Sequence, residues 1–184
     1  MSTQNFTSRD AIEGVDSLFT TRWSPRQYLS TPVSDSDLRI IFDAARWSPS
    51  SYNEQPWFFI TSTASSYDTF FNLLFEDNQA WAKTAPVIGF VLSKKHFDLN
   101  GSENFYGSFD AGAAWMAMSL QAKMMNLYTH GLGGIHYDHV YDVFDIDREK
   151  YTVICGFTIG YADPEGGEEI TDRHELTKTW RSIK

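Results

Sequence analysis

Cysteine and long apolar runs are almost missing from this sequence, and each absence narrows the possible functions. Cys155 is the only cysteine among 184 residues, which excludes an intramolecular disulfide and a cysteine-based metal site. No apolar stretch approaches the ~20 residues of a transmembrane helix. The first residues lack the basic start and apolar run of a secretory signal. We therefore expect a cytoplasmic protein that forms one domain over residues 1–184.

Basic residues are also in short supply. Fifteen lysines and arginines stand against 24 acidic residues, for a net charge of -9. This charge disfavours binding to nucleic acid or to an anionic membrane surface, because both need a positive partner. Aromatic residues, in contrast, are abundant at 16%. Such a surplus is typical of a folded protein with aromatic side chains at interfaces or ligand sites.

Apolar residues recur at helical spacing in four segments. In the second of these, Ser34 is a predicted N-cap with Asp37 at the third helical position. The fourth is the longest, and Gly131 is predicted to stop it. The four predicted helices cover residues 10–19, 34–45, 66–75 and 108–128.

Three other segments have the pattern of strands, namely residues 58–61, 86–93 and 151–160. The second is apolar on both faces, which predicts a central strand. Strands and helices do not alternate regularly. The pattern favours an α+β fold, with a small mixed or antiparallel sheet covered by helices.

The connection between residues 47 and 57 is unusually polar. Two prolines stiffen it, and four hydroxyl or amide side chains fall within six residues. These side chains could read the polar edge of a planar ligand. A polar loop that satisfies its own hydrogen bonds is the alternative. The four residues are Ser50, Ser51, Asn53 and Gln55.

Arginines suggest a second ligand contact. Arg22 and Arg26 flank Ser24, and this arrangement can converge on a phosphate group. In an acidic chain, a local basic cluster is easier to explain if an anion binds there. Arg173, near the end of the chain, is a candidate third ligand. The alternatives are surface salt bridges for the first two and a solvated charge for Arg173.

A glycine-rich stretch and several histidines lie between residues 130 and 139. The glycines allow a flat ligand to approach the backbone, but they do not form a Walker or Rossmann phosphate loop. His130, His136 and His139 do not have the spacing of a recognised zinc site. Solvated or hydrogen-bonded histidines are the favoured interpretation. Cys155 lies within a strand pattern and is predicted to be a buried thiol.

In their order along the chain, these segments resemble the FMN-dependent nitroreductase family. The resemblance is carried by Arg-x-Ser-x-Arg at residues 22–26 and by Ser-Pro-Ser-Ser-x-Asn-x-Gln-Pro-Trp at residues 48–57. Asn78 and Trp81 ahead of Ala85-Pro86, the 110–114 helix motif, Gly-Leu-Gly at 131–133 and Arg173 complete it. The chain departs from many members at residues 136–139 and at Thr171.

The resemblance implies an α+β homodimer with FMN at the subunit interface, each site drawing on both chains. The phosphate ligands would be Arg22, Ser24, Arg26 and Arg173, with Trp23 adding backbone contacts. The isoalloxazine ring would contact Ser50, Ser51, Asn53 and Gln55, with Asn78 on the pyrimidine side. Backbone groups of His136, Tyr137 and Asp138 would lie near the reactive nitrogen of the flavin.

The family further implies an oxidoreductase in which NADH or NADPH reduces the flavin and an electron-poor acceptor reoxidises it by a ping-pong mechanism. Nitroaromatics, quinones and activated alkenes are expected acceptors. No catalytic acid or base is predicted. The alternatives are another reduction on the same scaffold, of an enone or a semialdehyde, and a non-enzymatic flavin-binding protein or redox sensor. A metal-dependent hydrolase ranks last.

Overall fold

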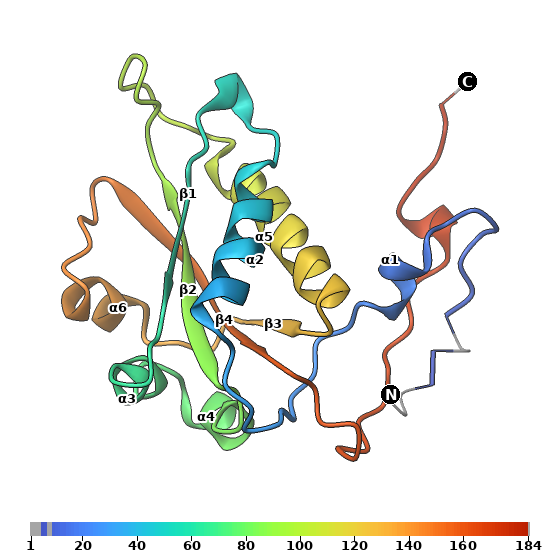
Figure 1. Ribbon diagram of the computed structural model, residues 1–184. Coiled ribbons are helices and arrows are strands. Elements are labelled where there is room, and N and C mark those ends of the chain that lie inside the picture. The colour runs from blue at the N-terminus through green and yellow to red at the C-terminus, as the bar shows by residue number, and fades with distance from the viewer. Residues whose placement is uncertain (1–4, 7–8, 184) are drawn as a thin grey trace.

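The centre of the protein is a four-stranded sheet, seen in the computed structural model of Figure 1, which describes residues 5, 6 and 9–183. Neighbouring strands are antiparallel throughout, in the order β1-β2-β4-β3. The predicted α+β fold with a small, mostly antiparallel sheet is confirmed. The strands are β1 (Trp57–Thr61), β2 (Val87–Lys94), β3 (Tyr128–Leu132) and β4 (Tyr151–Gly160).

Helices cover both faces of this sheet (Figure 1). The α2 and α5 helices lie side by side on one face, while α3, α4 and α6 lie on the other. Two short 3₁₀ turns, η1 and η2, lie outside these layers. The bounds are α1 (Ser17–Thr21), α2 (Asp35–Arg46), η1 (Ser51–Asn53), α3 (Tyr67–Phe71), α4 (Glu76–Ala82), α5 (Gly107–Met124), α6 (Tyr137–Val143) and η2 (Leu176–Lys178).

Strand β2 supplies both layers of the core, as its apolar pattern predicts. Val87 and Val91 face the layer that contains α2 and α5, whereas Ile88 and Phe90 face the other helices. Gly89 lies opposite Phe157 in the sheet register, and a Cβ at this glycine would come within 2.3 Å of the phenylalanine ring. The glycine therefore lets this ring lie flat across the sheet.

Helix α2 begins as its sequence predicts. The Ser34 hydroxyl accepts a hydrogen bond from the Asp37 backbone N–H at 3.1 Å. Ile41 and Ala45 are buried in the core, and Leu38 and Phe42 pack against it. Local capping and apolar periodicity agree here, so the element is specified from its own sequence.

The predicted helix over residues 10–19 is wrong in extent. Only Ser17–Thr21 is helical, and it starts from Asp16, whose carboxylate accepts from the Leu18 N–H at 2.7 Å. Gly14 adopts a φ of 95° just before it. The apolar residues Ile12, Val15 and Phe19 are exposed. Without a core to cover this stripe, most of the segment stays outside the helix.

The predicted end of the long helix is also wrong. Helix α5 stops at Met124, and Asn126 then takes the left-handed conformation with φ 59°. Asparagine serves here as the residue that reverses the chain. Gly131, the predicted stop, instead lies within β3, paired with Phe157.

The predicted helix over residues 66–75 is confirmed only in its first part, over residues 67–71. Helix α3 ends at Phe71, and the chain then pairs with the 133–135 connection, since the Phe75 N–H donates to the Gly134 carbonyl at 2.9 Å. Helix α4 follows at once, and neither it nor α6 or β3 was predicted. Each has seven residues or fewer, which is too short for a clear periodic signal.

The two terminal segments of the described chain lie on the same side of the molecule, where α1 is close to the carboxyl-terminal segment (Figure 1). Residues 1–4, on which part of the secretory-signal prediction rests, are outside the described residues. Within residues 5, 6 and 9–183, no helix combines the length and apolarity needed to cross a bilayer.

Candidate functional site

The arginine segment at residues 22–26 runs along β3. Trp23 is buried and packs edge-on against Tyr128, with 5.9 Å between ring centroids. The Pro25 carbonyl lies 2.8 Å from the His130 Nδ1 atom, so Nδ1 carries the proton that is shared with it. These two contacts fix the backbone on which Arg22, Ser24 and Arg26 are mounted.

Arg22 lies among other cations. Burial lowers the pKa of its guanidinium, and Arg173 and then Arg9 lower that pKa further. Among the described residues, its side chain donates a single hydrogen bond, a long contact of 3.4 Å with the Ser24 hydroxyl. Within the described part of the chain, neither Arg22, Arg26 nor Arg173 forms an ion pair with a carboxylate. The three arginines among the predicted phosphate ligands are thus cations without a carboxylate ion pair in the described part of the chain.

The carboxyl-terminal segment docks directly on this arginine segment. The Glu168 carboxylate accepts hydrogen bonds from the backbone N–H groups of Arg26, at 2.8 and 2.9 Å, and of Gln27, at 2.8 Å. Five residues later comes Arg173, whose hydrogen bonds at 3.1 to 3.4 Å are to its neighbours Thr171 and Asp172. This contact brings Arg173 close to Arg22, and the charge of Arg173 lowers the pKa of Arg22.

The predicted isoalloxazine loop has a strained backbone. Tyr52, Asn53 and Gln55 all have positive φ, at 53°, 56° and 52°. Such conformations cost about 1–2 kcal/mol each for residues other than glycine, and they persist only where surrounding contacts enforce them. They make this loop a candidate ligand site on grounds independent of its composition.

Hydrogen bonds hold this loop in place. The buried carboxylate of Asp110, in the first turn of α5, accepts from the Ser51 N–H at 3.0 Å. The Ser50 hydroxyl accepts from the Gln55 N–H at 3.0 Å, and the Gln55 amide donates to the Asn53 carbonyl at 2.9 Å. The loop therefore satisfies itself in part, as the alternative interpretation expects, while the exposed Asn53 side chain stays available.

Asn78 is already engaged on both sides of its carboxamide. Its Nδ2 atom donates to the Gly134 carbonyl at 2.9 Å, and its Oδ1 atom accepts from the Trp81 indole at 3.2 Å. A Cβ at Gly134 would come within 2.5 Å of Nδ2. Asn78 thus positions the connection between β3 and α6, and one N–H and one lone pair remain for a ligand.

Residues 136–138 begin α6 and are held on several sides. The His136 N–H donates to the Leu73 carbonyl at 2.9 Å, and its ring packs on Phe75 at 4.7 Å. The Tyr137 hydroxyl donates to the Ile154 carbonyl at 3.3 Å. The Asp138 carboxylate accepts a hydrogen bond from Arg148 at 2.6 Å. The Asp138 side chain therefore has a structural role, and its backbone is the part that could contact a ligand.

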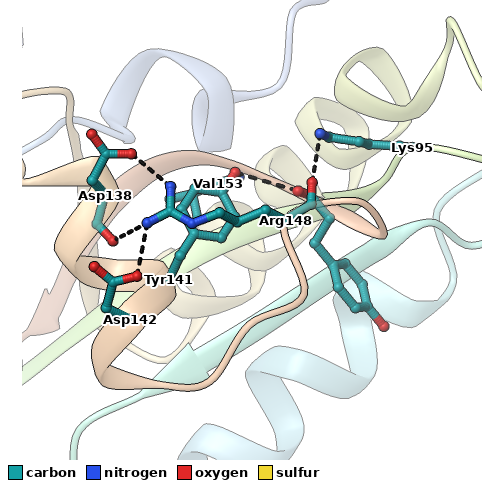
Figure 2. Close-up of polar contacts among 7 residues, drawn as sticks. Lys95, Asp138, Tyr141, Asp142, Arg148 and Val153 are labelled. Carbon is teal, nitrogen blue, oxygen red and sulfur yellow. Dashed lines mark hydrogen bonds and ion pairs between the residues drawn. The ribbon is translucent and has the colours of Figure 1, made fainter.

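Figure 2 shows how Arg148 ties α6 to the chain that follows it. The guanidinium bonds to Asp138 and, at 2.8 Å, to Asp142. Lys95 donates to the Arg148 carbonyl at 2.6 Å, and Tyr141 accepts from the Val153 N–H of β4 at 2.9 Å. The backbone at 136–138 is therefore firmly placed, which a role through backbone groups would require.

The predicted residues form two separate sets. His130, Asn78 and residues 22–26 gather past the carboxyl end of α5, where Trp81 stacks on His130 at 4.6 Å. The 50–55 loop is anchored at Asp110, at the opposite end. Asp110 and Met124 are separated by about 21 Å along the helix axis at 1.5 Å per residue. One chain thus holds two partial sites.

The histidines have partners other than a metal. His130 bonds to Pro25 and stacks on Trp81, and the His136 and His139 rings are 5.5 Å apart. No group of three metal-ligating side chains was found within the described ranges. Cys155 is half-buried rather than fully buried as predicted, and this burial raises the pKa of its thiol to about 11.

Three residues of the site were not predicted as ligands or supports. Arg9 and Glu168 contact the arginine segment, and Asp110 anchors the polar loop. All three bond to backbone atoms, which carry no side-chain signature. Only Asp110 had a sequence signal, as the first residue of the 110–114 motif.

Comparison with known proteins extends the resemblance. A sequence model described as the nitroreductase family matches residues 19–76 and 68–161. A solved structure of an oxidoreductase containing FMN is 34% identical to this chain, covers 98% of both chains and superimposes with a TM-score of 0.90.

More distant structures share the fold. A protein from Desulfovibrio desulfuricans in complex with FMN is 22% identical, with a TM-score of 0.77 over 95% of this chain and 99% of its own. An enone reductase of gut-bacterial fatty acid saturation is 17% identical, with a TM-score of 0.76 over 94% and 98%.

Proposed function

The chain belongs to the nitroreductase family, and on that basis we propose that it is a homodimeric, cytoplasmic FMN-dependent oxidoreductase. It would take electrons from NADH or NADPH and pass them to electron-poor acceptors such as nitroaromatics or quinones. The observation that carries the proposal is the proximity of Arg22 and Arg173, with Arg26 four residues further along the same segment as Arg22. None of the three arginines has an ion-pair partner in the described part of an acidic chain, and together they would fit a bound phosphate dianion.

The remaining residues also fit FMN. Asn53 offers a free carboxamide, and Asn78 retains one donor and one acceptor after its contacts with Gly134 and Trp81. Gly134 has no side chain to obstruct the approach of a flat ring to the backbone. Residues 136–138 present a backbone that α6, Leu73 and Arg148 hold in place. When bound, FMN would supply the two-electron redox chemistry that no side chain of this protein provides.

A second copy of the chain would complete the site. The phosphate-binding set and the polar loop lie at opposite ends of α5, whose axis rises about 21 Å between Asp110 and Met124. In a symmetric dimer the loop of one copy can meet the arginines of the other, which gives two equivalent sites. Exposed apolar residues on α1, on the segment before it and on the carboxyl-terminal segment support this arrangement, since a partner would cover them. Among them are Ile12, Phe19, Leu176 and Trp180.

The two substrates would use the same open face in turn, which gives ping-pong kinetics. The role of this chain is to grip the phosphate, to fix the ring edge through Asn53 and Asn78, and to leave one face open. No side chain is assigned as a general acid or base.

An absorbance spectrum tests the proposal. The purified protein is recorded as isolated, after addition of FMN, and then anaerobically with NADPH or NADH. We expect a flavin spectrum that bleaches with nucleotide and recovers with menadione. A protein that binds FMN but is never reduced by either nucleotide would be a flavin-binding protein or sensor. A folded dimer that binds no FMN would refute the proposal.

Reduction of an activated alkene is a second candidate for the same site. The enone reductase that shares this fold supports it. Steady-state rates with an enone and with a nitroaromatic, measured on the same preparation, separate the two. The acceptor with the higher kcat/KM would define the substrate class.

A further inference from the structure

The guanidinium of Arg9 joins its own segment to two others, the segment around residues 20–22 and the segment around Thr171. Its Nη1 atom donates to the carbonyl oxygens of Thr20 at 2.7 Å and of Arg22 at 2.9 Å. Its Nε and Nη2 atoms both donate to the Thr171 carbonyl, at 3.1 and 2.9 Å. A planar fork with fixed donor directions is needed to make these bonds together.

These acceptors flank the proposed phosphate ligands. One carbonyl belongs to Arg22 itself, and another belongs to Thr171, two residues before Arg173. The two segments come from opposite ends of the sequence, since Arg9 and Thr171 are 162 residues apart. Arg9 therefore sets the distance between the backbone that carries Arg22 and the backbone that carries Arg173.

The charge of Arg9 adds to the same place. Burial lowers its pKa, Arg173 lowers it further, and the nearby Asp172 raises it. The Phe6 ring lies 5.5 Å from its guanidinium carbon. Arg9 is thus a third guanidinium close to Arg22 and Arg173. Its four hydrogen bonds to carbonyls use the donors that would otherwise bind an anion directly.

We infer that Arg9 is a positioning residue for the phosphate-binding arginines: it holds Arg22 and Arg173 at the separation that a phosphate dianion needs. The inference rests on the proposed FMN function, and it adds a residue whose effect is confined to the phosphate end of the ligand. A role limited to general folding would affect ligands with and without phosphate equally. A role through charge alone would be kept by lysine.

The experiment measures dissociation constants for FMN and for riboflavin, which lacks the phosphate, by flavin fluorescence with flavin-free full-length protein. The variants are Arg9→Gln, Arg9→Lys and, as the matched control, Arg39→Gln on the exposed surface of α2. We expect Arg9→Gln to weaken FMN binding by about tenfold or more. Riboflavin binding should change less than about twofold, and Arg39→Gln should change neither.

The lysine variant separates position from charge. Lysine keeps the cation but lacks the fork, so Arg9→Lys should lose most of the same FMN affinity. Wild-type FMN affinity in Arg9→Lys would overturn the inference, as would equal losses for FMN and riboflavin. If Arg9→Gln does not fold, the ratio of the two losses in Arg9→Lys decides in the same way.

The inference and the proposed function fail differently. Wild-type protein that binds neither flavin refutes both. Wild-type protein that binds FMN more tightly than riboflavin, together with an Arg9→Gln variant that behaves identically, leaves the proposed function standing and refutes the role of Arg9.

Discussion

The polar loop at residues 50–55 and the arginine segment at residues 22–26 are both candidate ligand sites, but they differ in where unfavourable energy is stored. In the loop the backbone carries the strain, with three left-handed residues, while most of its polar groups are hydrogen-bonded. In the arginine segment the backbone is firmly bonded, and the strain is electrostatic, because Arg22 lies close to Arg9 and Arg173.

This difference predicts how each region responds to a ligand. Repulsion among cations is relieved by an anion, so the arginine segment should gain the most stability when a phosphate binds. The loop is already held by Asp110 and by its own hydrogen bonds, so binding should change it little. We therefore expect the arginine segment to contribute most of the affinity for a phosphate ligand and the loop to contribute the shape of the site.

The largest effect is expected for Arg22→Ala. Loss of a charge-assisted bond of about 1.5–3 kcal/mol should weaken FMN binding by about tenfold to a hundredfold. The flavin-free protein should lose almost no stability, because repulsion with Arg173 and Arg9 is also removed. Fluorescence titration and urea unfolding measure the two quantities, with Arg39→Ala as control. An equal loss in both would mean that Arg22 is structural.

Asp110→Ala should show the opposite behaviour. The Ser51 N–H loses its buried acceptor, so the free energy of unfolding of the flavin-free protein should fall by about 1–3 kcal/mol. Urea unfolding checks this. Asp43→Ala, which removes an exposed ion pair with Arg46 at 2.8 Å, should change stability far less. Equal effects of the two substitutions would show that Asp110 does not anchor the loop.

A smaller and favourable effect is expected for Tyr52→Gly. Tyr52 is 84% exposed and has φ 53°, so glycine should relieve backbone strain and raise stability by about 0.5–1 kcal/mol. Tyr52→Ala removes the same ring but keeps the Cβ, and it should give no gain. Thermal unfolding of both variants isolates the backbone contribution. A gain with alanine as large as that with glycine would argue against strain.

The smallest effect concerns pH. Burial lowers the pKa of His130, and Arg26 and Arg22 act in the same direction, so the unfolded chain binds this proton more readily than the folded protein. Stability should therefore fall as the pH drops below about 6.5, the usual histidine pKa. The slope should be a fraction of the about 1.4 kcal/mol per pH unit that one full proton gives.

His130→Gln should flatten this slope, and FMN should flatten it in the wild type, because a phosphate near the arginines favours the charged imidazole. Urea unfolding at pH 7.5, 6.5 and 5.5, with and without FMN, measures both effects. A slope that neither the substitution nor FMN alters would mean that His130 does not sense the arginine cluster.

The elements that the sequence predicted well are those with a strong local signal. Helix α2 has a cap and an apolar stripe, and β2 is apolar on both faces. The errors have physical causes as well. The stripe at residues 10–19 has no core to cover in a single chain, and α5 ends at an asparagine in a conformation more often adopted by glycine.

The site shows the same division. The sequence identified Arg22, Arg26 and Asn53 because their side chains carry the expected chemistry, although their contacts with FMN remain predictions. Arg9, Glu168 and Asp110 support the site through backbone N–H and C=O groups. Every residue has these groups, so no pattern of residue types could indicate which of them would be bonded.

The Arg9 bond to Thr171 also orders events in time. A contact that closes a loop of 162 residues must wait until residue 171 has been synthesised and the intervening chain has folded around the sheet. Arg22 and Arg173 can reach their mutual arrangement only after that. A chain truncated before residue 171 would keep all four strands of the sheet but would lack this arrangement, so we expect it to bind the proposed cofactor more weakly.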